Sequence, residues 1–385
     1  MKIGIAAFHL FRSNKHGMDI AALELIKELS SLKLPHTFYI FSMHGPDDHL
    51  LDHLPGIKVI HMPKVPYPVA EQVVLPLLAH YYGLDLLHCT TNTAPLLCAV
   101  PTVTTLHDVI FLEYKLSRYR SMYHKMANLY RKIIVPHAVK NSKRIITVSG
   151  TEIHSIFRYM PKAVSKLDMI PNAIAAHFYQ CEKEDQPVNL VLPERYIFFH
   201  GNGDPKKNMD GVLKAFAHLV DTGKADFKLL LSESDEKVLL KTLLRLNLMQ
   251  IKDHIVAAGY IQNNLLPAVY RKALVFLYPG IRESFGLPII EAMACGTPVI
   301  TSNKSALPET AGDAAIYINP DDPIQLAEAI DFLVHDDVTR QDLIAKGIIR
   351  SKMFSRLNTA QATVNVYESV LKGRSKTQVS SIKTV

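Results

Sequence analysis

Short apolar runs alternate with amphipathic segments of helical length along most of this chain. In the first half, the runs that we predict to be buried strands are residues 2–8, 37–41, 58–61, 85–88, 102–107 and 144–148. The first helix between them is indicated by Leu23, Ile26 and Leu29, which share one face, with Lys27 on the other. This alternation predicts a parallel sheet covered by helices on both faces.

The same alternation starts again after Pro193. The second set of predicted strands comprises residues 196–199, 228–231, 255–258, 275–278, 298–301 and 315–318. We therefore expect an α/β protein with two doubly wound, Rossmann-like parallel sheets, in domains of residues 1–185 and 186–357. A polar linker is expected at 182–193. A long amphipathic helix is expected at about 358–373, and a polar tail at 374–385.

Composition narrows the class of protein. The chain has 385 residues, of which 48% are hydrophobic, so it has enough apolar surface for two packed cores. Its apolar runs are far shorter than the roughly 18 residues of a membrane span. The first run, 3–11, is interrupted by His9 and does not resemble a signal sequence. The four cysteines lack CxxC spacing, which predicts reduced thiols in a cytoplasmic protein, without disulfides or structural zinc.

The net charge of +7 is unevenly distributed. Residues 1–180 hold 19 basic and 12 acidic side chains, whereas residues 181–385 hold 24 of each. Segment 115–144, which includes Arg118 and Arg120, holds nine Lys or Arg and no acidic residue. It is either a solvated face of amphipathic helices or a surface that attracts a phosphate-bearing acceptor or an anionic membrane. No nucleic-acid-binding module accompanies it, so nucleic acid is not an expected partner.

Segment 282–300 carries the densest candidate chemistry. Gly286 and Pro288 predict a helix start just after the strand that ends near Tyr278. The backbone N–H groups of such a start point at a ligand above the sheet edge, where a pyrophosphate fits well. Glu283 and Glu291 would then accept hydrogen bonds from sugar and ribose hydroxyls of one bound molecule. Two solvated glutamates are the simpler interpretation, but the Gly and Pro positions at the strand end favour binding.

Two more strand ends carry polar residues. The strand at 196–199 runs into a Gly-rich turn at Gly201, followed by Lys206 and Lys207. These residues suit a diphosphate, with Lys207 neutralising the leaving group, although a solvated lysine pair is the alternative. His107 ends the strand at 102–107 and either faces a ligand or packs against backbone. No HxxxH or HExxH spacing accompanies these residues, so no metal is expected, and the first turn lacks the GxGxxG of dinucleotide-binding dehydrogenases.

Taken in order, these pieces resemble glycosyltransferase family 4, and the likeness covers nearly the whole chain. The matching segments are His107-Asp108, Thr147 to Ser149, Ile170 to Ala173, Gly201 to Asn208 and Glu283 to Glu291. The resemblance implies the GT-B fold, with two Rossmann-like domains facing a central cleft. It also implies that the helix at 358–373 crosses back onto the N-terminal domain.

The resemblance assigns roles to single residues. It implies catalytic roles for His107, Lys207 and Glu283. The donor-binding residues that it implies are Gly201, Asn202, Lys206, Lys207, Tyr260, Ile261, Glu283, Ser284, Phe285, Gly286, Leu287 and Glu291. The residues that we place on the acceptor side are Gly17, Asp108, Arg118 and Arg120. Four positions depart from the family pattern. Asn202 stands where an Arg is common, and Gly17-Met18 where many members have two glycines. Ala173 replaces a usual Gly, and Ser232 to Ser234 replaces a common pair of glycines.

The implied reaction is transfer of a sugar, with retained anomeric configuration, from a nucleoside-diphosphate sugar such as a GDP- or UDP-sugar. The expected acceptor is a hydroxyl of a glycan or lipid-linked molecule in cell-surface polysaccharide or glycolipid synthesis. No metal or other cofactor is expected, because Lys207 and the helix start at Gly286 would stabilise the diphosphate. The alternatives are a catalytically weak nucleotide-sugar or glycan-binding partner subunit and a nucleotide-sugar epimerase of the same fold. The expected location is cytoplasmic, on the inner face of the membrane.

Overall fold

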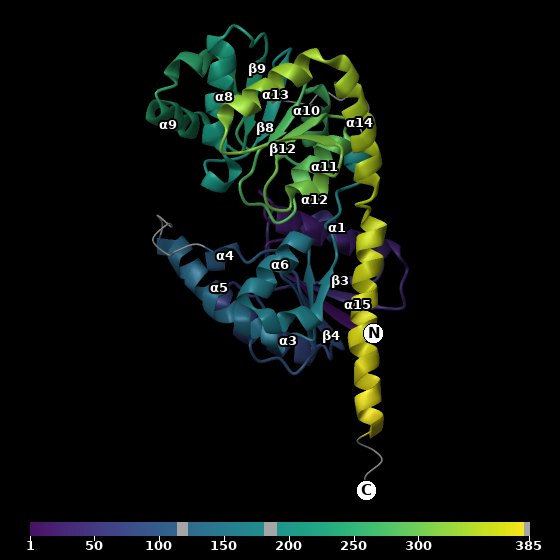
Figure 1. Cartoon of the computed structure of the whole chain (residues 1–385). Helices are drawn as coiled ribbons and strands as arrows, with labels where there is room; N and C mark the ends of the chain where they lie inside the picture. The colour runs from purple at the N-terminus through teal and green to yellow at the C-terminus, as the bar shows by residue number, and fades with distance from the viewer. Residues whose placement is uncertain (114–121, 181–190, 381–385) are drawn as a thin grey trace. The chain divides into compact units, whose positions relative to one another are not determined.

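The chain forms two compact units (Figure 1). The structure is a computed structural model that describes residues 1–113, 122–180 and 191–380. The N-terminal unit comprises Met1–Ala173 with Arg356–Val385, and the C-terminal unit comprises Ile174–Ser355. The division falls before the expected boundary at 185, because α7 (His177–Gln180) packs in the C-terminal unit, where Phe178 contacts the Tyr270 ring. Most of the expected linker lies outside the described residues.

The N-terminal unit is built on a seven-stranded parallel sheet in the order β3-β2-β1-β4-β5-β6-β7. Its strands are β1 (Lys2–Ala6), β2 (Thr37–Ser42), β3 (Ile57–His61), β4 (Leu86–Cys89), β5 (Thr102–Thr105), β6 (Arg144–Thr147) and β7 (Leu167–Met169). The first six confirm the predicted runs. Strand β7 was not predicted, because its three residues alternate Leu, Asp and Met and are too few to carry a pattern.

Helices cover both faces of this sheet. They are α1 (Gly17–Ser31), η1 (Asp48–Leu51), α2 (Tyr67–Val69), η2 (Ala70–Val74), α3 (Leu75–Tyr81), α4 (Ile110–Glu113), α5 (Met122–Asn141), α6 (Gly150–Tyr159), η4 (Pro161–Lys166) and α15 (Arg356–Ser380). On one face Ile3 and Ile5 of β1 pack with α1 and α15, and on the other Phe41 and Leu87 pack with η2 and α3.

Helix α15 returns from the C-terminal unit to complete the N-terminal one, as the resemblance implied. Its Tyr367 is fully buried, and the hydroxyl lies 2.7 Å from Nδ1 of His88 in β4. The helix continues to Ser380, past the expected end at 373. The expected tail is therefore helical as far as Ser380, since a single Gly373 without a following proline does not stop a helix.

The C-terminal unit is built on a six-stranded parallel sheet in the order β10-β9-β8-β11-β12-β13. Its strands, all predicted, are β8 (Tyr196–His200), β9 (Lys228–Ser232), β10 (Ile255–Ala257), β11 (Phe276–Tyr278), β12 (Val299–Ser302) and β13 (Ala315–Ile318). Its remaining helices are η5 (Pro205–Lys207), α8 (Met209–Asp221), α9 (Glu236–Leu246), η6 (Met249–His254), α10 (Leu266–Lys272), α11 (Leu287–Ala294), α12 (Leu307–Ala311), α13 (Pro323–His335) and α14 (Asp337–Lys352).

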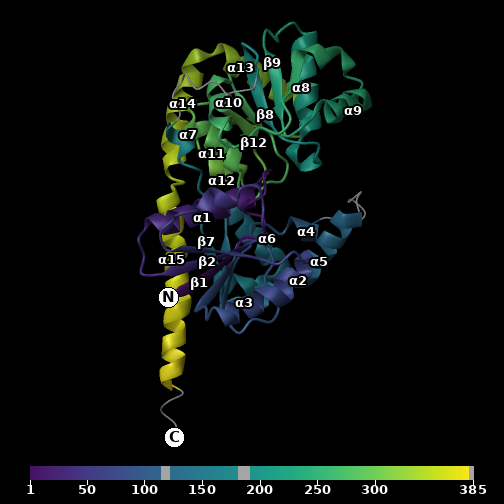
Figure 2. The same cartoon turned by 180° about the vertical axis from the view of Figure 1, so that it is seen from behind.

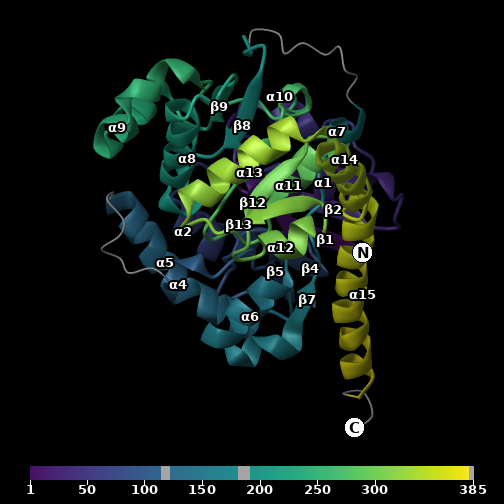
Figure 3. The same ribbon diagram turned by 45° about the horizontal axis from the view of Figure 1, so that its top comes forward.

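Alternate residues of the C-terminal sheet enter two different cores. Phe199 and Leu277 pack with α8 and α13, which lie together on one face (Figure 3). Phe198 and Phe276 instead contact the Tyr270 ring of α10 on the other face, at centroid distances of 5.3 and 5.0 Å. The sheet is thus buried on both sides, which confirms the predicted doubly wound architecture.

In both sheets the strand order reverses at the first strand. Strand β1 lies between β2 and β4, and β8 lies between β9 and β11. Open parallel sheets bind ligands beyond the carboxyl ends of the strands at such a reversal. The loops that follow β8 and β11, where the sequence placed most donor-binding residues, meet this condition. Among the described residues, no helix has the length and hydropathy to cross a membrane.

Candidate active site

The backbone of the loop after β8 is fixed by Gly201 and Asn208. A Cβ on Gly201 would lie 2.5 Å from the Phe199 ring, so the chain passes too close for any side chain there. Asn208 adopts a left-handed conformation, with φ of 64°, and its side chain accepts a hydrogen bond from the Gly211 N–H to cap α8. Lys207 is thereby held in the short η5 helix, at the carboxyl edge of the sheet.

The loop after β11 is held by short polar contacts. The Glu283 N–H donates to Oγ of Ser305 at 3.1 Å, and the Ser302 hydroxyl donates to the Gly280 carbonyl at 2.5 Å. Gly286 has φ of 97°, and a Cβ there would lie 2.8 Å from Leu307, so glycine is required. Helix α11 begins directly afterwards with Pro288 in its first turn, and no side chain caps its start. The helix therefore starts where the sequence predicted.

These two loops meet across the strand-order reversal. The Ile281 N–H donates to the Lys206 carbonyl at 2.7 Å. The Nζ of Lys207 lies 2.8 Å from Oε1 of Glu283 and donates to the Tyr278 hydroxyl at 2.7 Å. The structure thus brings together two residues that the sequence singled out separately, and it adds Tyr278. We call Lys207, Glu283 and Tyr278 the charged cluster.

The charged cluster keeps its lysine protonated. Burial alone would lower the pKa of Lys207, but the Glu283 carboxylate outweighs burial and raises it. Nearby, burial and the Lys207 charge lower the pKa of His200 to about 3. A neutral histidine and a permanently charged lysine therefore lie at this edge of the sheet, where a diphosphate would need a cation.

Glu291 lies in a second polar cluster. It is 5% exposed, and the Tyr270 hydroxyl of α10 donates to its Oε2 at 3.2 Å. Burial raises the pKa of Glu291 to about 7. Near neutral pH this carboxyl is therefore divided between its neutral and charged forms, and only the charged form accepts hydrogen bonds at both oxygens.

Three other predicted donor-binding residues make contacts within the protein. Asn202 accepts a hydrogen bond from the Asp204 N–H at 3.0 Å and so stabilises its own turn. The Nζ of Lys206 lies 3.7 Å from the Asp204 carboxylate. Phe285 is a core residue whose ring packs on Phe354, so only its backbone is available to a ligand.

Residues 259–261 are fastened to the loop after β9. The Gly259 N–H donates to the Ser234 carbonyl at 3.2 Å, and its carbonyl accepts from the Glu233 N–H at 2.7 Å. Tyr260 is 39% exposed, whereas Ile261 is buried. The segment therefore presents one aromatic side chain from a fixed backbone.

In the N-terminal unit, His107 lies just beyond β5 and is held by backbone. The backbone N–H of His107 donates to Oδ1 of Asn92 at 2.8 Å, and the ring Nε2 lies 3.0 Å from the Thr90 carbonyl. Because a carbonyl only accepts, Nε2 carries the proton and Nδ1 is the acceptor of a neutral ring. Burial lowers the pKa of His107, in agreement with this neutral form. Asp108 accepts a hydrogen bond from the Ile110 N–H at 3.0 Å.

A cavity of about 40 Å³ lies beside His107. Its polar lining includes His88, Thr90, Thr105 and Arg356. Burial lowers the pKa of His88 to about 3, so this histidine is also neutral. Gly17 opens α1 at the surface, and Arg118 and Arg120 lie outside the described residues.

Sequence reasoning missed a buried carboxylate near His107. Glu71 is 1% exposed and accepts hydrogen bonds from Tyr67 at 2.9 Å, Gln72 at 2.8 Å and Tyr130 at 2.6 Å, and also from Thr93. It lies in η2, a π-helical turn, a feature that often marks functional positions. Glu71 thus fixes the loop whose Asn92 bonds His107. The available signal was a lone acidic residue within the apolar segment 69–79.

Comparison with known proteins agrees with this geometry. A family model described as Glycosyltransferase Family 4 matches residues 16–178, and one described as Glycosyl transferases group 1 matches residues 181–350. The O-antigen chain mannosyltransferase B of Escherichia coli is 31% identical over 279 residues, which cover 69% of this chain and 70% of that protein. This chain belongs to glycosyltransferase family 4. It is a glycosyltransferase, and the partner-subunit and epimerase alternatives are not favoured.

Two further likenesses support the assignment. The O-antigen chain mannosyltransferase RfbU of Salmonella typhimurium is 28% identical over 257 residues, which cover 65% of each chain. The crystal structure of Anabaena HepE with UDP and glucose superposes with a TM-score of 0.71 at 16% identity, covering 96% of this chain and 100% of that one. This second likeness establishes the fold alone, which is GT-B.

Proposed function

We propose that this glycosyltransferase moves a mannosyl residue from a nucleoside-diphosphate sugar to a hydroxyl of a growing, lipid-linked glycan of the cell surface. The sugar and the glycan class follow the names of its O-antigen relatives. The single observation that carries the proposal is the charged cluster, in which a protonated lysine lies 2.8 Å from a carboxylate at the strand-order reversal.

The charged cluster suits the departure of a diphosphate. As the sugar–phosphate bond breaks, negative charge grows on the leaving phosphate, and Lys207 and the amino end of α11 stabilise it. Glu283 balances the lysine charge before the donor arrives and then accepts sugar hydroxyls. The acceptor oxygen forms the new bond to the anomeric carbon, with retained configuration, and its proton passes to the leaving phosphate. In this proposal the charge is balanced without a metal ion.

The other site residues hold the two ends of the donor. Glu291, when ionised, accepts hydrogen bonds from the ribose hydroxyls, and Tyr270 orients its carboxylate. Tyr260 packs against the base. We assign His107 to the transferred sugar, because its neutral ring adds no positive charge to the cation-like transition state.

The acceptor side carries a membrane-binding surface. Four apolar side chains, each at least 48% exposed, form one stripe along α5: Met122, Met126, Leu129 and Ile133. By helical spacing, Lys125 and Lys140 of the same helix lie close to this stripe, whereas Arg131 lies on the opposite face. The α2–α3 region lies beside α5 (Figure 2). The Tyr130 hydroxyl of α5 donates to Glu71 of η2, and the η2–α3 segment exposes Val73, Leu77 and Tyr81. Apolar side chains beside basic ones suit the anionic inner face of a membrane that carries the acceptor.

A donor panel tests the proposal. The full chain would be titrated with GDP-mannose, GDP-fucose, UDP-glucose and UDP-galactose, with melting temperature and transfer to a lipid-linked glycan acceptor as readouts. We expect a mannosyl donor to raise the melting temperature most and to be the sugar transferred. Glu283→Gln is expected to abolish transfer, whereas Glu328→Gln, an exposed change on α13, keeps it. Full activity in Glu283→Gln would contradict the site, and transfer of another sugar would contradict the donor.

A further inference from the structure

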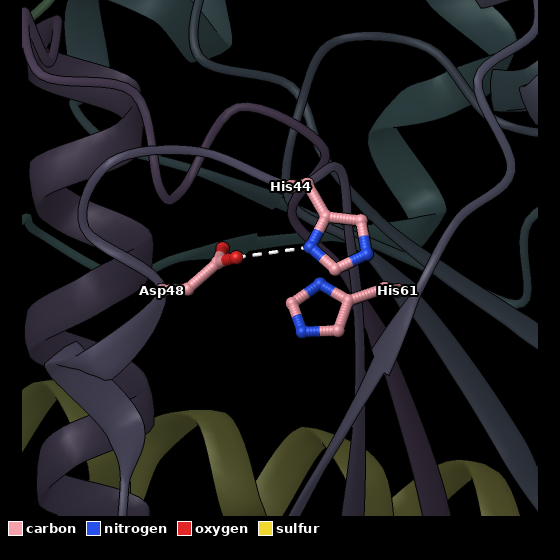
Figure 4. A group of neighbouring side chains, drawn as sticks. All are labelled: His44, Asp48 and His61. Carbon is pink, nitrogen blue, oxygen red and sulfur yellow. Dashed lines mark hydrogen bonds and ion pairs between the residues drawn. The ribbon is translucent and has the colours of Figure 1, made fainter.

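Two histidines and an aspartate meet at the carboxyl ends of β2 and β3 (Figure 4). Strand β2 pairs with β3 in a register that puts Ser42 opposite His61, so His44, two residues later, lies beside the end of β3. Asp48 opens the short helix η1. The candidate ligand atoms of these three side chains all lie within 4.8 Å of one another. Among the described residues, no other three His, Cys, Asp or Glu side chains form such a group.

The backbone prepares this arrangement. The Gly45 N–H donates to Oδ1 of Asp48 at 3.0 Å, which turns Oδ2 toward Nδ1 of His44 at 2.9 Å. A Cβ on Gly45 would lie 2.1 Å from the Phe11 carbonyl, so only glycine allows the loop to approach there. The Met43 N–H donates to the Phe8 carbonyl at 3.0 Å and fastens the loop to the segment after β1. Backbone partners of this kind orient metal ligands and raise affinity.

The two imidazole rings contact each other face to face. Their centroids lie 3.7 Å apart and their planes differ by 11°. Two protonated rings at this distance would repel, whereas one divalent cation accepts a lone pair from each neutral ring. Two imidazole nitrogens and one carboxylate oxygen suit Zn²⁺, while Mg²⁺ and Ca²⁺ prefer oxygen ligands alone. Tetrahedral zinc needs ligand atoms roughly 3.4 Å apart and lone pairs that converge on the ion, so the two stacked rings must turn relative to one another when the ion binds.

The geometry points to a Zn²⁺ site formed by His44, Asp48 and His61, with a fourth position for water. The ion would clamp the β2–η1 loop to the end of β3, and so stabilise the segment after β1 that contacts this loop. The site lies in the N-terminal unit and shares no residue with the charged cluster. No local spacing indicates it, since it depends on the register of two strands.

The first test measures metal content and coordination. Untagged full-length protein is equilibrated with Zn²⁺, dialysed against metal-free buffer and analysed for bound metal. A parallel sample is loaded with Co²⁺, whose visible absorption reports tetrahedral coordination. We expect one equivalent of Zn²⁺, an intense Co²⁺ band, and an affinity at least about tenfold weaker in both His44→Ala and His61→Ala.

The control separates a built site from an ordinary surface pair. His335 lies 3.3 Å from the Asp331 carboxylate on α13, in a His–Asp pair without a second histidine in its group. His335→Ala is expected to keep the full metal content. Melting temperatures of all variants in chelator are expected to match that of the parent, which shows that each folds. Equal Zn²⁺ content in the parent and the His44→Ala, His61→Ala double variant, or a parent without the Co²⁺ band, would overturn the proposal.

Discussion

The carboxyl edges of the two sheets differ in the charge of their titratable side chains. In the C-terminal unit, Lys207 and Glu283 form a part-buried ion pair. In the N-terminal unit, burial lowers the pKa values of two histidines near the edge, His107 and His88, and the buried Glu71 carboxylate is surrounded by hydrogen-bond donors. The C-terminal edge thus carries an ion pair, whereas the two histidines near the N-terminal edge are neutral. In the proposed reaction, the departing diphosphate needs the ion pair, and the hydroxyl groups of the acceptor suit the neutral histidines.

The largest effect is expected from removing Lys207, the cation of the C-terminal edge. Lys207→Met is expected to lower kcat by about 10²- to 10³-fold, because the leaving diphosphate loses its positive partner. Steady-state transfer assays at saturating donor measure the effect. Lys224→Met, which removes a lysine ion-paired with Asp331 at the surface, serves as the matched control and should keep kcat. A Lys207→Met enzyme that folds and retains its kcat would show that the charged cluster is structural.

The carboxylate of Glu291 offers a second test, because its raised pKa makes the free energy of unfolding depend on pH. The unfolded Glu291 carboxyl ionises near 4.5, but the folded one ionises only near 7, so the folded state binds more protons between these values. The free energy of unfolding contributed by this group therefore falls as pH rises from about 4.5 to 7, by roughly 3 kcal/mol in all.

Glu291→Gln is expected to remove that fall, and denaturant titrations of the ligand-free protein between pH 5 and about pH 8 measure it. The informative quantity is the difference between parent and variant, because other groups titrate in both. Glu328→Gln, at an exposed glutamate, should reproduce the parent curve. Parallel curves for the parent and Glu291→Gln would mean that Glu291 is ionised throughout.

The surface of the N-terminal unit offers a third test. Replacing Met126 and Ile133 by Glu removes two exposed apolar side chains of α5 and adds negative charge. We expect binding to vesicles rich in anionic phospholipid to weaken by at least about tenfold, while donor binding stays unchanged. Vesicle sedimentation measures the first and calorimetry the second. Leu244→Glu, at a comparably exposed site on α9, is the control. Equal vesicle binding in both variants would show that the exposed face of α5 does not bind the membrane.

The smallest effect is expected from the tyrosine of the charged cluster. Tyr278→Phe removes one acceptor from Lys207 and leaves the ion pair, so kcat should fall by only about five- to tenfold, the cost of one hydrogen bond. Tyr179→Phe removes a comparable bond, to the Ser351 carbonyl at 2.8 Å, and should lower stability without changing kcat. A larger loss of kcat in Tyr278→Phe than in Lys207→Met would contradict the proposal that Lys207 contributes more to catalysis than Tyr278.

Much of the architecture could be predicted because its signals are local. Buried parallel strands are apolar throughout, and the Gly and Pro positions around Gly286 mark a strand end and a helix start. Lys207 and Glu283 were each singled out because their loops carried a signal, but their pairing was not predicted. Strand β7 and the length of α15 were less visible, because three alternating residues and one tolerated glycine carry little information.

The rest depended on contacts that no local pattern encodes. Tyr270 and Tyr278 look like ordinary core residues until Glu291 and Lys207 are placed beside them. His44 and His61 become neighbours only through the β2–β3 register. The basic segment was visible as charge, but the apolar stripe on α5 required knowledge of which face the sheet covers.

The contact between Tyr367 and His88 has a consequence for the order in which the protein folds. Ala360, Val364 and Tyr367 of α15 belong to the same core as Ile3 and Ile5 of β1. During synthesis, these first strands leave the ribosome hundreds of residues before the helix that covers them. The C-terminal unit, whose segments all lie between residues 174 and 355, has its full sequence earlier. The half of the protein that is made first is therefore the half that is finished last.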